Sequence, residues 1–389
     1  MPTRADPAPQ PAGGGPLAGL LVADFSRVLA GPYATMLLGD LGATVLKVES
    51  PAGDDTRRWG PPWTGGESTY FLSVNRNKRS VVLDLTDPRG QAVAQRLAAR
   101  ADVLVENFKT GGAERLGIGY HQLRAGNPAL VYCSITGYGT GAGAQLPAYD
   151  LIVQAVSGLA RLTGPDPDTP TKTGIPVTDV ITGLHAAVGI LAAVDHRRRT
   201  GQGQQISLNL LSSTLSGMVN FTGSYALRGE VAQPMGMRHP SLCPYQAYPT
   251  ADRPLVVAAG NESQFARLCK CLDLPELVQD PRFGSNQDRV AHRAELNRLL
   301  AGQLRRRTAA AWQELLDAAG VPCGPINDLA EAVALADRLG LAPIVEVGGV
   351  RQVASPFGLS ATPVSYRHPP PALGEATDEV VGWLDAADR

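Results

Sequence analysis

The segment Leu20–Glu49, LLVADFSRVLAGPYATMLLGDLGATVLKVE, decides the fold class of this chain. It opens with a short apolar run over 20–25, continues with apolar residues at helical spacing over 31–41, and ends in a second strand-like run over 44–49. A strand, a helix and a second strand at this spacing are typical of a βαβ unit, whose strands are parallel. The segment therefore predicts an α/β fold.

The same alternation continues further along the chain. Strand-like runs occupy 80–85, 102–108 and 129–135. Asp87-Pro88 is typical of a helix start, with Asp as the N-cap and Pro in the first turn. Repeated units of this kind predict a mainly parallel sheet covered by helices on both faces, so we expect a Rossmann-like large domain.

The composition changes along the chain and suggests domain boundaries. Residues 1–15 are rich in Pro, Ala and Gly and lack an apolar segment, which is typical of a flexible tail and not of a signal peptide. We expect a large domain over 16–227, completed by about 345–389. A Pro-, His- and Cys-rich stretch followed by amphipathic helices predicts a smaller α/β domain over 228–330. Residues 331–344 are expected to form a linker.

Charge and cysteine content argue against several functional classes. The formal net charge is -1, whereas a nucleic-acid binder usually carries a basic excess. The five cysteines are odd in number and lack metal-ligand spacing, so we expect free thiols, a reducing, cytoplasmic setting and no metal site. The longest apolar run, Val180–Val194, is shorter than the ~18 residues of a membrane span and contains His185. We therefore expect neither nucleic acid nor a membrane as a partner.

Asp179 lies in the segment GIPVTDVITG (174–183), directly before the apolar run 184–194. Asp is among the preferred N-cap residues, so a simple helix cap is one interpretation. A carboxylate at a helix start also faces free backbone N–H groups and the positive end of the helix dipole, which should keep it ionised. An ionised and accessible carboxylate can act as a nucleophile, which is the second interpretation.

Longer segments carry a family resemblance. Besides the opening stretch, they are NRNKRSVVLDL (75–85), DVLVENFKTGGAERLGIGY (102–120), SITGYG (134–139), AYDLIVQAVSGL (148–159) and RRRTGQGQQISLNLLSS (197–213). In this order and spacing, from about Pro16 to Leu384, the chain resembles the family III CoA-transferases. That family includes formyl-CoA transferase, carnitine CoA-transferase and the α-methylacyl-CoA racemases.

The resemblance implies an acyl-CoA:carboxylate CoA-transferase in which Asp179 is the nucleophile. The carboxylate attacks the donor thioester to give a mixed anhydride and CoA thiolate, and the thiolate then forms an aspartyl-CoA thioester. The acceptor acid takes the CoA by the reverse steps, which splits one difficult transfer into several easier ones. The CoA thioester is thus a substrate, and no permanently bound cofactor is implied.

The resemblance also assigns a CoA-binding role to positions of the large domain. These are Val28, Leu83, Asn107, Phe108, Arg115, Leu116, Tyr149 and Asp150. Arg115 carries a fork-shaped donor group that suits a phosphate, and Asn107 and Phe108 follow a strand, where α/β sheets place their ligands. Taken singly, Phe108 could equally be a core residue and Arg115 a solvated helix residue.

Tyr149 bears on the choice of reaction within the family. The racemases have a His directly before the matching acid and use a His/Asp pair to move the α-proton, whereas this chain has Tyr149 before Asp150. A Tyr, whose ordinary pKa is ~10, is a poor base at neutral pH. The pattern favours transfer over racemisation. An acyl-CoA racemase or epimerase and a non-catalytic CoA-binding protein remain as alternatives.

Two departures from formyl-CoA transferase concern the substrate. Leu29 stands where that enzyme has a Gln, which argues against oxalate or formate as substrates. Its flexible tetraglycine loop is replaced by Ala258–Asn261. Ala259, Gly260 and Asn261 would form a stiffer loop, whose backbone N–H groups are still expected to cover the intermediate.

The stretches HPSLCPYQAYPT (239–250) and VVAAGNESQFARLCKCLDLPEL (256–277) resemble another branch of the family. This branch contains the succinyl-CoA:dicarboxylate transferases, such as the glutarate and hydroxymethylglutarate CoA-transferases. The resemblance implies succinyl-CoA as the donor and a dicarboxylate as the acceptor. Arg238 and His239 are candidates to hold the distal carboxylate, and a surface-loop pair without that role is the alternative.

The resemblance further implies a quaternary structure. In the family each chain threads through a ring formed by the other, which gives an interlaced homodimer. The active site lies near the contact of one large domain with the small domain of the partner. The expected partners are therefore an acyl-CoA, a carboxylic acid and a second copy of the chain.

Overall fold

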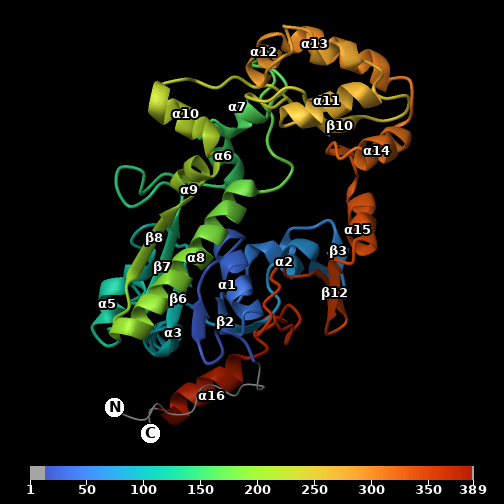
Figure 1. Ribbon diagram of the computed structural model, residues 1–389. Helices are drawn as coiled ribbons and strands as arrows, with labels where there is room; N and C mark the ends of the chain where they lie inside the picture. Colours follow the sequence, from blue (N-terminus) through green and yellow to red (C-terminus); the bar gives the residue numbers. More distant parts are fainter. Residues whose placement is uncertain (1–13, 388–389) are drawn as a thin grey trace. The chain divides into compact units, whose positions relative to one another are not determined.

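The computed structural model describes residues 14–387, which form two compact units (Figure 1). The first unit comprises 14–159, 172–231 and 342–387, and the second comprises 160–171 and 232–341. Residues 1–13 of the expected N-terminal tail lie outside the described residues.

The expected linker over 331–344 is mostly helical. Helix α15 (Leu329–Arg338) begins at Asp328, whose side chain accepts a hydrogen bond from the backbone N–H of Glu331 at 2.8 Å. The side chain of Glu331 in turn accepts one from the N–H of Asp328 at 3.0 Å. This capping box satisfies two N–H groups that would otherwise be free and so stabilises the helix start. Helix α15 is counted with the second unit, which extends to Leu341.

A six-stranded parallel sheet forms the centre of the first unit, in the order β5-β2-β1-β6-β7-β8. The strands are β1 (Leu21–Asp24), β2 (Thr44–Glu49), β5 (Lys78–Val82), β6 (Val103–Glu106), β7 (Val131–Thr136) and β8 (Gln205–Asn209). Because β1 pairs with β2 on one side and with β6 on the other, the direction of winding reverses between β1 and β6. This is the Rossmann-type strand order, and the expected α/β class is confirmed.

Helices cover both faces of this sheet (Figure 1). The remaining elements of the first unit are α1 (Ala30–Asp40), η1 (Asp55–Arg58), β3 (Trp63–Thr64), β4 (Glu67–Ser68), α2 (Thr69–Ser73), α3 (Pro88–Arg100), α4 (Gly112–Arg115), α5 (Tyr120–Arg124), α6 (Asp150–Val156), α8 (Val177–Thr200), α9 (Leu210–Gly217), α10 (Asn220–Arg228), β12 (Ile344–Val347), β13 (Val350–Val353) and α16 (Thr377–Ala387). Val22 and Val131 belong to the core shared with α1 and α8, and their neighbours Ala23 and Tyr132 belong to the core shared with α3, α5 and α16. Successive strand residues thus point to opposite faces of the sheet.

Helix α8 has 24 residues and is long and apolar enough, by length and composition alone, to cross a membrane. The apolar run 180–194 was expected to be too short for this, and the helix is longer because it continues at both ends of the run. It contacts α1, α9, β7 and β8 and buries Ala186, Ile190 and Ala193 in the core of the first unit. These are the contacts of a core helix.

Gly183 allows α8 to lie close to α1. A Cβ at this position would lie 2.7 Å from the carbonyl oxygen of Ala30 and 3.1 Å from Cδ1 of Tyr33. Any larger residue would therefore push the two helices apart. Since Asp179 lies one helical turn before Gly183, the close approach brings it to the turn that precedes α1.

The second unit contains a three-stranded antiparallel sheet in the order β11-β10-β9. Its elements are α7 (Leu159–Thr163, all but its first residue), β9 (Tyr245–Tyr248), β10 (Leu255–Ala258), α11 (Glu262–Cys271), η2 (Pro275–Val278), α12 (Asn286–Ala291), α13 (Arg293–Leu304), α14 (Ala309–Ala318), β11 (Cys323–Pro325) and α15. Phe265, Leu300 and Trp312 of three different helices meet in its core with Val257 of the sheet. The second unit thus has its own hydrophobic core.

Candidate active site

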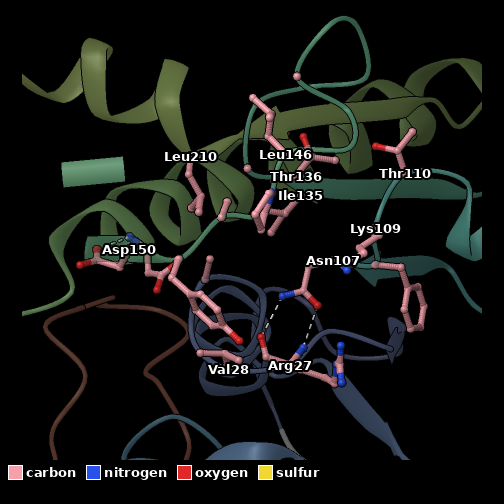
Figure 2. A pocket seen from close by; sticks show the side chains of 18 of the residues that line it. Arg27, Val28, Asn107, Lys109, Thr110, Ile135, Thr136, Leu146, Asp150 and Leu210 are labelled. Carbon is pink, nitrogen blue, oxygen red and sulfur yellow. Dashed lines mark hydrogen bonds between the residues drawn. The ribbon is translucent and has the colours of Figure 1, made fainter. Parts of the chain in front are cut away.

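A cavity of about 320 Å³ opens in the first unit, at the carboxyl ends of β1, β6 and β7 (Figure 2). The winding of the sheet reverses here, and open α/β sheets bind their ligands at such points. The predicted site residues that line the cavity are Val28, Leu29, Asn107, Phe108, Tyr149, Asp150 and Asp179. The structure therefore brings together residues that are up to about 150 positions apart in the sequence.

Other lining residues were not singled out from the sequence. They include Arg27, Asp55, Lys109, Thr110, Thr136 and Gln145. A signal was available for three of them, because Arg27, Lys109 and Thr136 lie at or just after the carboxyl ends of β1, β6 and β7. Two of these three are cations, which suits a ligand that carries phosphates.

Asn107 fixes the turn that follows β1. Its side chain accepts a hydrogen bond from the N–H of Arg27 at 2.9 Å and donates one to the carbonyl of Arg27 at 2.8 Å (Figure 2). A side-chain amide has both the donor and the acceptor that this pair of hydrogen bonds requires. Asn107 thus joins the turns after β1 and β6 across the point where the winding reverses.

Phe108 is oriented by the buried carboxyl group of Glu106, which accepts a hydrogen bond from the N–H of Phe108 at 2.8 Å. Burial raises the pKa of Glu106 to about 6. Phe108 lines the cavity and also packs against the core on the α3 side of the sheet. Both interpretations of this residue, ligand contact and core packing, are therefore compatible with its position.

The start of α8 contradicts one of the two interpretations of Asp179, that of a simple N-cap. Pro176 is the N-cap, and Asp179 lies within the first turn. The capping carboxylate comes instead from Asp150 on α6. Its Oδ1 accepts hydrogen bonds from the N–H groups of Thr178 at 2.9 Å and Asp179 at 3.3 Å, and from the hydroxyl of Thr178. Asp150 therefore takes the N–H groups that Asp179 was expected to face.

The pKa of Asp179 is raised as a result. Burial, followed by the negative charge of Asp150, raises the pKa of Asp179 to about 7. The expectation that the helix start keeps Asp179 ionised is wrong, because burial, followed by the negative charge of Asp150, disfavours the ionised carboxylate. Asp179 therefore changes its protonation state near neutral pH, well above the range of an ordinary carboxyl group.

Gln154 holds Asp150 in its capping position. Its Nε2 donates a hydrogen bond to Oδ2 of Asp150 at 2.6 Å, and its Oε1 accepts one from the N–H of Thr173 at 2.9 Å. The side chain of Gln154 is buried, and both carboxylate oxygens of Asp150 are engaged. Asp150 is therefore a positioning group. The sequence signal for Gln154 was its place one helical turn after Asp150.

Two tyrosines lie close to these acids. Tyr149, which lines the cavity, is 64% exposed. Burial, followed by the charges of Asp179 and Asp150, raises the pKa of Tyr70 on α2 to about 12, so this side chain remains a neutral hydroxyl. Sequence reasoning missed Tyr70 because no local pattern links it to either acid.

Three of the predicted CoA-binding residues do not line the cavity. Leu83 is buried in the core on the α3 side of the sheet, and Leu116 packs against the same core. Arg115 is exposed on α4, and its side chain has no hydrogen-bond or ion-pair partner within residues 14–387. Its guanidinium is therefore available to a ligand, and its position is equally that of a solvated helix residue.

The predicted loop residues Ala259, Gly260 and Asn261 lie in the second unit. The N–H of Ala259 donates to the carbonyl of Pro244 at 2.9 Å, and the N–H of Gly260 donates to the side chain of Gln264 at 2.8 Å. Asn261 is the N-cap of α11. The N–H groups of Ala259 and Gly260, which were expected to cover an intermediate, are therefore already bonded within the unit.

Arg238 and His239 also lie in the second unit. Arg238 is exposed, and its Nε donates to the carbonyl of Met235 at 2.9 Å, while its terminal nitrogens have no partner in the described part of the chain. Nδ1 of His239 accepts a hydrogen bond from the N–H of Ser241 at 3.1 Å, and its ring centroid lies 5.1 Å from that of Tyr245. Arg238 is thus the less constrained of the two side chains.

The cysteines differ in burial, with Cys133, Cys243 and Cys269 buried and Cys271 and Cys323 partly exposed. All five cysteines are free. Cys133 is buried in β7, and burial raises its pKa to about 12, which suppresses the reactive thiolate. Across residues 14–387, no group of three or more His, Cys, Asp or Glu side chains is placed to hold a metal ion.

We expect Asp179→Asn to stabilise the first unit at alkaline pH. The folded-state pKa of about 7 exceeds the ordinary value of 3.8, so ionising Asp179 destabilises the fold progressively as the pH rises between these values. The substitution should raise the free energy of unfolding by about 1–3 kcal/mol at pH 8 and by almost nothing at pH 4. Denaturant titrations at both pH values measure the effect.

The matched control is Asp195→Asn, because Asp195 is exposed on the same helix and pairs with Arg199 at 3.0 Å. It should change the free energy of unfolding by less than about 0.5 kcal/mol at either pH. An effect of Asp179→Asn that is independent of pH would contradict the raised pKa.

Comparison with known proteins agrees with the fold. The family model for CoA-transferase family III matches residues 17–377. The chain is 43% identical over 373 residues to succinyl-CoA:glutarate CoA-transferase of Mus musculus, covering 94% of this chain and 86% of that protein. It is 39% identical over 394 residues to succinate–glutarate CoA-transferase of Agrobacterium fabrum, covering 96% and 97% of the two chains.

A solved structure gives the same result. The crystal structure of a CAIB/BAIF family protein from Brucella suis superposes with a TM-score of 0.86 at 38% identity, covering 96% of this chain and 100% of that one. The family match spans most of the sequence, and the predicted resemblance is confirmed. The chain belongs to CoA-transferase family III.

Proposed function

We propose that this CoA-transferase carries CoA from succinyl-CoA to a C4–C6 dicarboxylate, with Asp179 as the nucleophile. The observation that carries the proposal is the carboxyl group of Asp179, which lines the cavity at the reversal point of the sheet and has a pKa of about 7. The turns that contain Val28 and Asn107 line the same cavity. A carboxylate with such a pKa is substantially ionised at neutral pH and basic enough to attack a thioester.

In the proposed reaction a carboxylate oxygen of Asp179 attacks the thioester carbon of the donor, the C–S bond breaks and CoA leaves as the thiolate. The thiolate attacks the carboxyl carbon of Asp179 in the mixed anhydride and releases the donor acid as a carboxylate. The acceptor carboxylate then attacks the aspartyl-CoA thioester and again releases the thiolate. The thiolate takes the acyl group from the new anhydride, and Asp179 returns as a carboxylate.

The arrangement of the two acids favours the covalent intermediates. Free Asp179 carries a negative charge in a partly buried position near Asp150, and both burial and the second acid disfavour that charge. The anhydride and the aspartyl-CoA thioester at Asp179 are neutral at this residue. Forming either intermediate therefore relieves the repulsion from Asp150, which lowers the cost of acylation.

The cavity offers groups for the rest of the CoA molecule. We assign contacts with CoA to Val28, Asn107 and Phe108, which line the cavity. Arg27 and Lys109 add positive charge to its wall, and this suits the phosphate groups of CoA. Arg115 remains a proposed phosphate ligand, since it is exposed on α4, the helix that follows β6.

The proposed substrates are supported by the named activities of the relatives and by one feature of the cavity. Both relatives described above have names that pair succinate or succinyl-CoA with glutarate. Leu29 places an apolar side chain in the wall, which suits the methylene groups of a C4–C6 acid better than the compact charge of oxalate. The exposed guanidinium of Arg238 is the proposed partner of the distal carboxylate.

We also propose that the protein is a homodimer of the interlaced family type. Helix α8 exposes Leu184, Val188 and Leu191, which lie on one side of the helix at a spacing of about one turn. Tyr225 and Leu227 of α10 are also exposed. Exposed apolar side chains in such number mark a surface that a partner covers, and a second copy is the partner that the family suggests.

Trapping of the covalent intermediate tests the role of Asp179. Protein incubated with succinyl-CoA should carry a CoA-sized adduct on the peptide that contains Asp179, as detected by mass spectrometry. Asp179→Asn should lose the adduct because an amide lacks the nucleophilic carboxylate, whereas the control Asp195→Asn should retain it. An adduct that persists in Asp179→Asn would remove Asp179 from this role.

Competition between acceptors tests the role of Arg238. In Arg238→Met, the ratio of kcat/KM for glutarate to that for butyrate should fall about tenfold, because one charge-assisted hydrogen bond to the distal carboxylate is lost. Arg298→Met, which changes another exposed Arg of the second unit, should leave the ratio unaltered. An unchanged ratio in Arg238→Met would show that Arg238 does not bind the distal carboxylate. The proposed role of Asp179 would not be affected by this result.

A further inference from the structure

The turn directly after β1 is bonded at successive backbone groups. The N–H of Ser26 donates to the Asp24 carboxylate at 3.0 Å, and the carbonyl of Ser26 accepts from Nζ of Lys47 at 3.1 Å. Arg27 is held at both of its backbone groups by Asn107. The turn is thus fixed by groups from β1, from β2 and from the end of β6.

Val28 completes this turn with a φ of 70°, in the left-handed region. A β-branched residue is rare in this region because its side chain crowds the backbone. The conformation costs energy and persists only where the surroundings enforce it, and such residues cluster at functional sites. Val28 fits this description, since it lies in the wall of the cavity.

The backbone N–H of Val28 faces the carboxylate of Asp54. The carboxylate accepts a hydrogen bond from the N–H of Val28, at 3.2 Å from Oδ2 and 3.4 Å from Oδ1. Oδ1 also accepts hydrogen bonds from the N–H and the hydroxyl of Thr56, at 3.0 and 2.8 Å. Oδ2 lies 2.9 Å from Nζ of Lys47, and both of these side chains are 0% exposed. An ion pair so removed from water is costly to break.

We propose that Lys47 and Asp54 form a positioning pair that holds Val28 in its strained conformation and thereby shapes the wall of the CoA cavity. This inference rests on the proposed CoA site. Neither residue lines the cavity, so the pair acts through the backbone of Ser26 and Val28. When the pair is loosened, Val28 relaxes toward negative φ, and CoA binds more weakly while the chemistry at Asp179 is unaffected.

A double-mutant cycle between positions 54 and 28 tests this inference, with the Kd of CoA measured by calorimetry and kcat measured with succinyl-CoA. Asp54→Asn should raise the Kd about tenfold and change kcat less than about twofold. Glycine adopts a φ of 70° without strain, so Val28→Gly no longer needs the pair. Adding Asp54→Asn to Val28→Gly should then raise the Kd less than about threefold. Equal effects of Asp54→Asn in both backgrounds would overturn the inference.

Two further variants separate positioning from folding. Asp54→Glu keeps a charge beside Lys47 but displaces the carboxylate from Val28, so it should raise the Kd even if Asp54→Asn fails to fold. Asp40→Asn breaks the buried Arg76–Asp40 ion pair, which has no contact with the turn. It should lower stability and leave the Kd unchanged. A raised Kd in Asp40→Asn would overturn the inference, because any loosening of the core would then suffice.

Asn107→Ala distinguishes failure of this inference from failure of the CoA site. If Asn107→Ala leaves the Kd of CoA unchanged, CoA does not bind in this cavity. Both the proposed CoA site and the proposed role of the Lys47–Asp54 pair are then rejected. If Asn107→Ala raises the Kd but the cycle shows no coupling between positions 28 and 54, the positioning pair alone is rejected.

Discussion

The candidate site depends on one interaction, the capping of α8 by a carboxylate from α6. This carboxylate belongs to Asp150. It accepts the N–H groups of Thr178 and Asp179, and Gln154 secures its second oxygen. One acid thus satisfies the helix start, and the second acid, Asp179, lacks the stabilisation that a helix start normally gives to a carboxylate. Burial and the charge of Asp150 then raise the pKa of Asp179 to about 7. Burial, followed by the charge of the capping acid, therefore gives the proposed nucleophile its basicity.

The sheet and the helix packing supply the other constraint. The reversal of winding between β1 and β6 separates the turns that follow these strands, and Asn107 bonds the two turns to each other. Gly183 lets α8 approach α1 closely, since a Cβ there would meet the carbonyl oxygen of Ala30 at 2.7 Å. The two arrangements bring Asp179 and the strained turn at Val28 to one cavity. The site is thus a consequence of tertiary packing around local βα units.

Much of the large domain was predictable, because its signals are local. Strand-like runs and the cap at Asp87 mark elements that the structure contains, and the α/β class and the family are confirmed. The capping of α8 was not predictable, since sequence preference alone favours Asp179 and the acid that accepts the N–H groups, Asp150, lies 29 positions earlier. Tyr70 and the helical part of 331–344 were missed for related reasons: the first depends on tertiary contacts, and the second on an overlooked capping box.

The most direct test of the central claim is a pH titration of the side-chain carboxyl carbon of Asp179 by carbon NMR, with the signal assigned by its absence in Asp179→Asn. The account predicts a midpoint near 7 in the wild-type protein, as burial and Asp150 require. It also predicts a clearly lower midpoint in Asp150→Asn, where an amide that still caps the helix replaces the negative charge. A wild-type midpoint near the ordinary value of about 4, or a midpoint that Asp150→Asn leaves unchanged, would contradict the account.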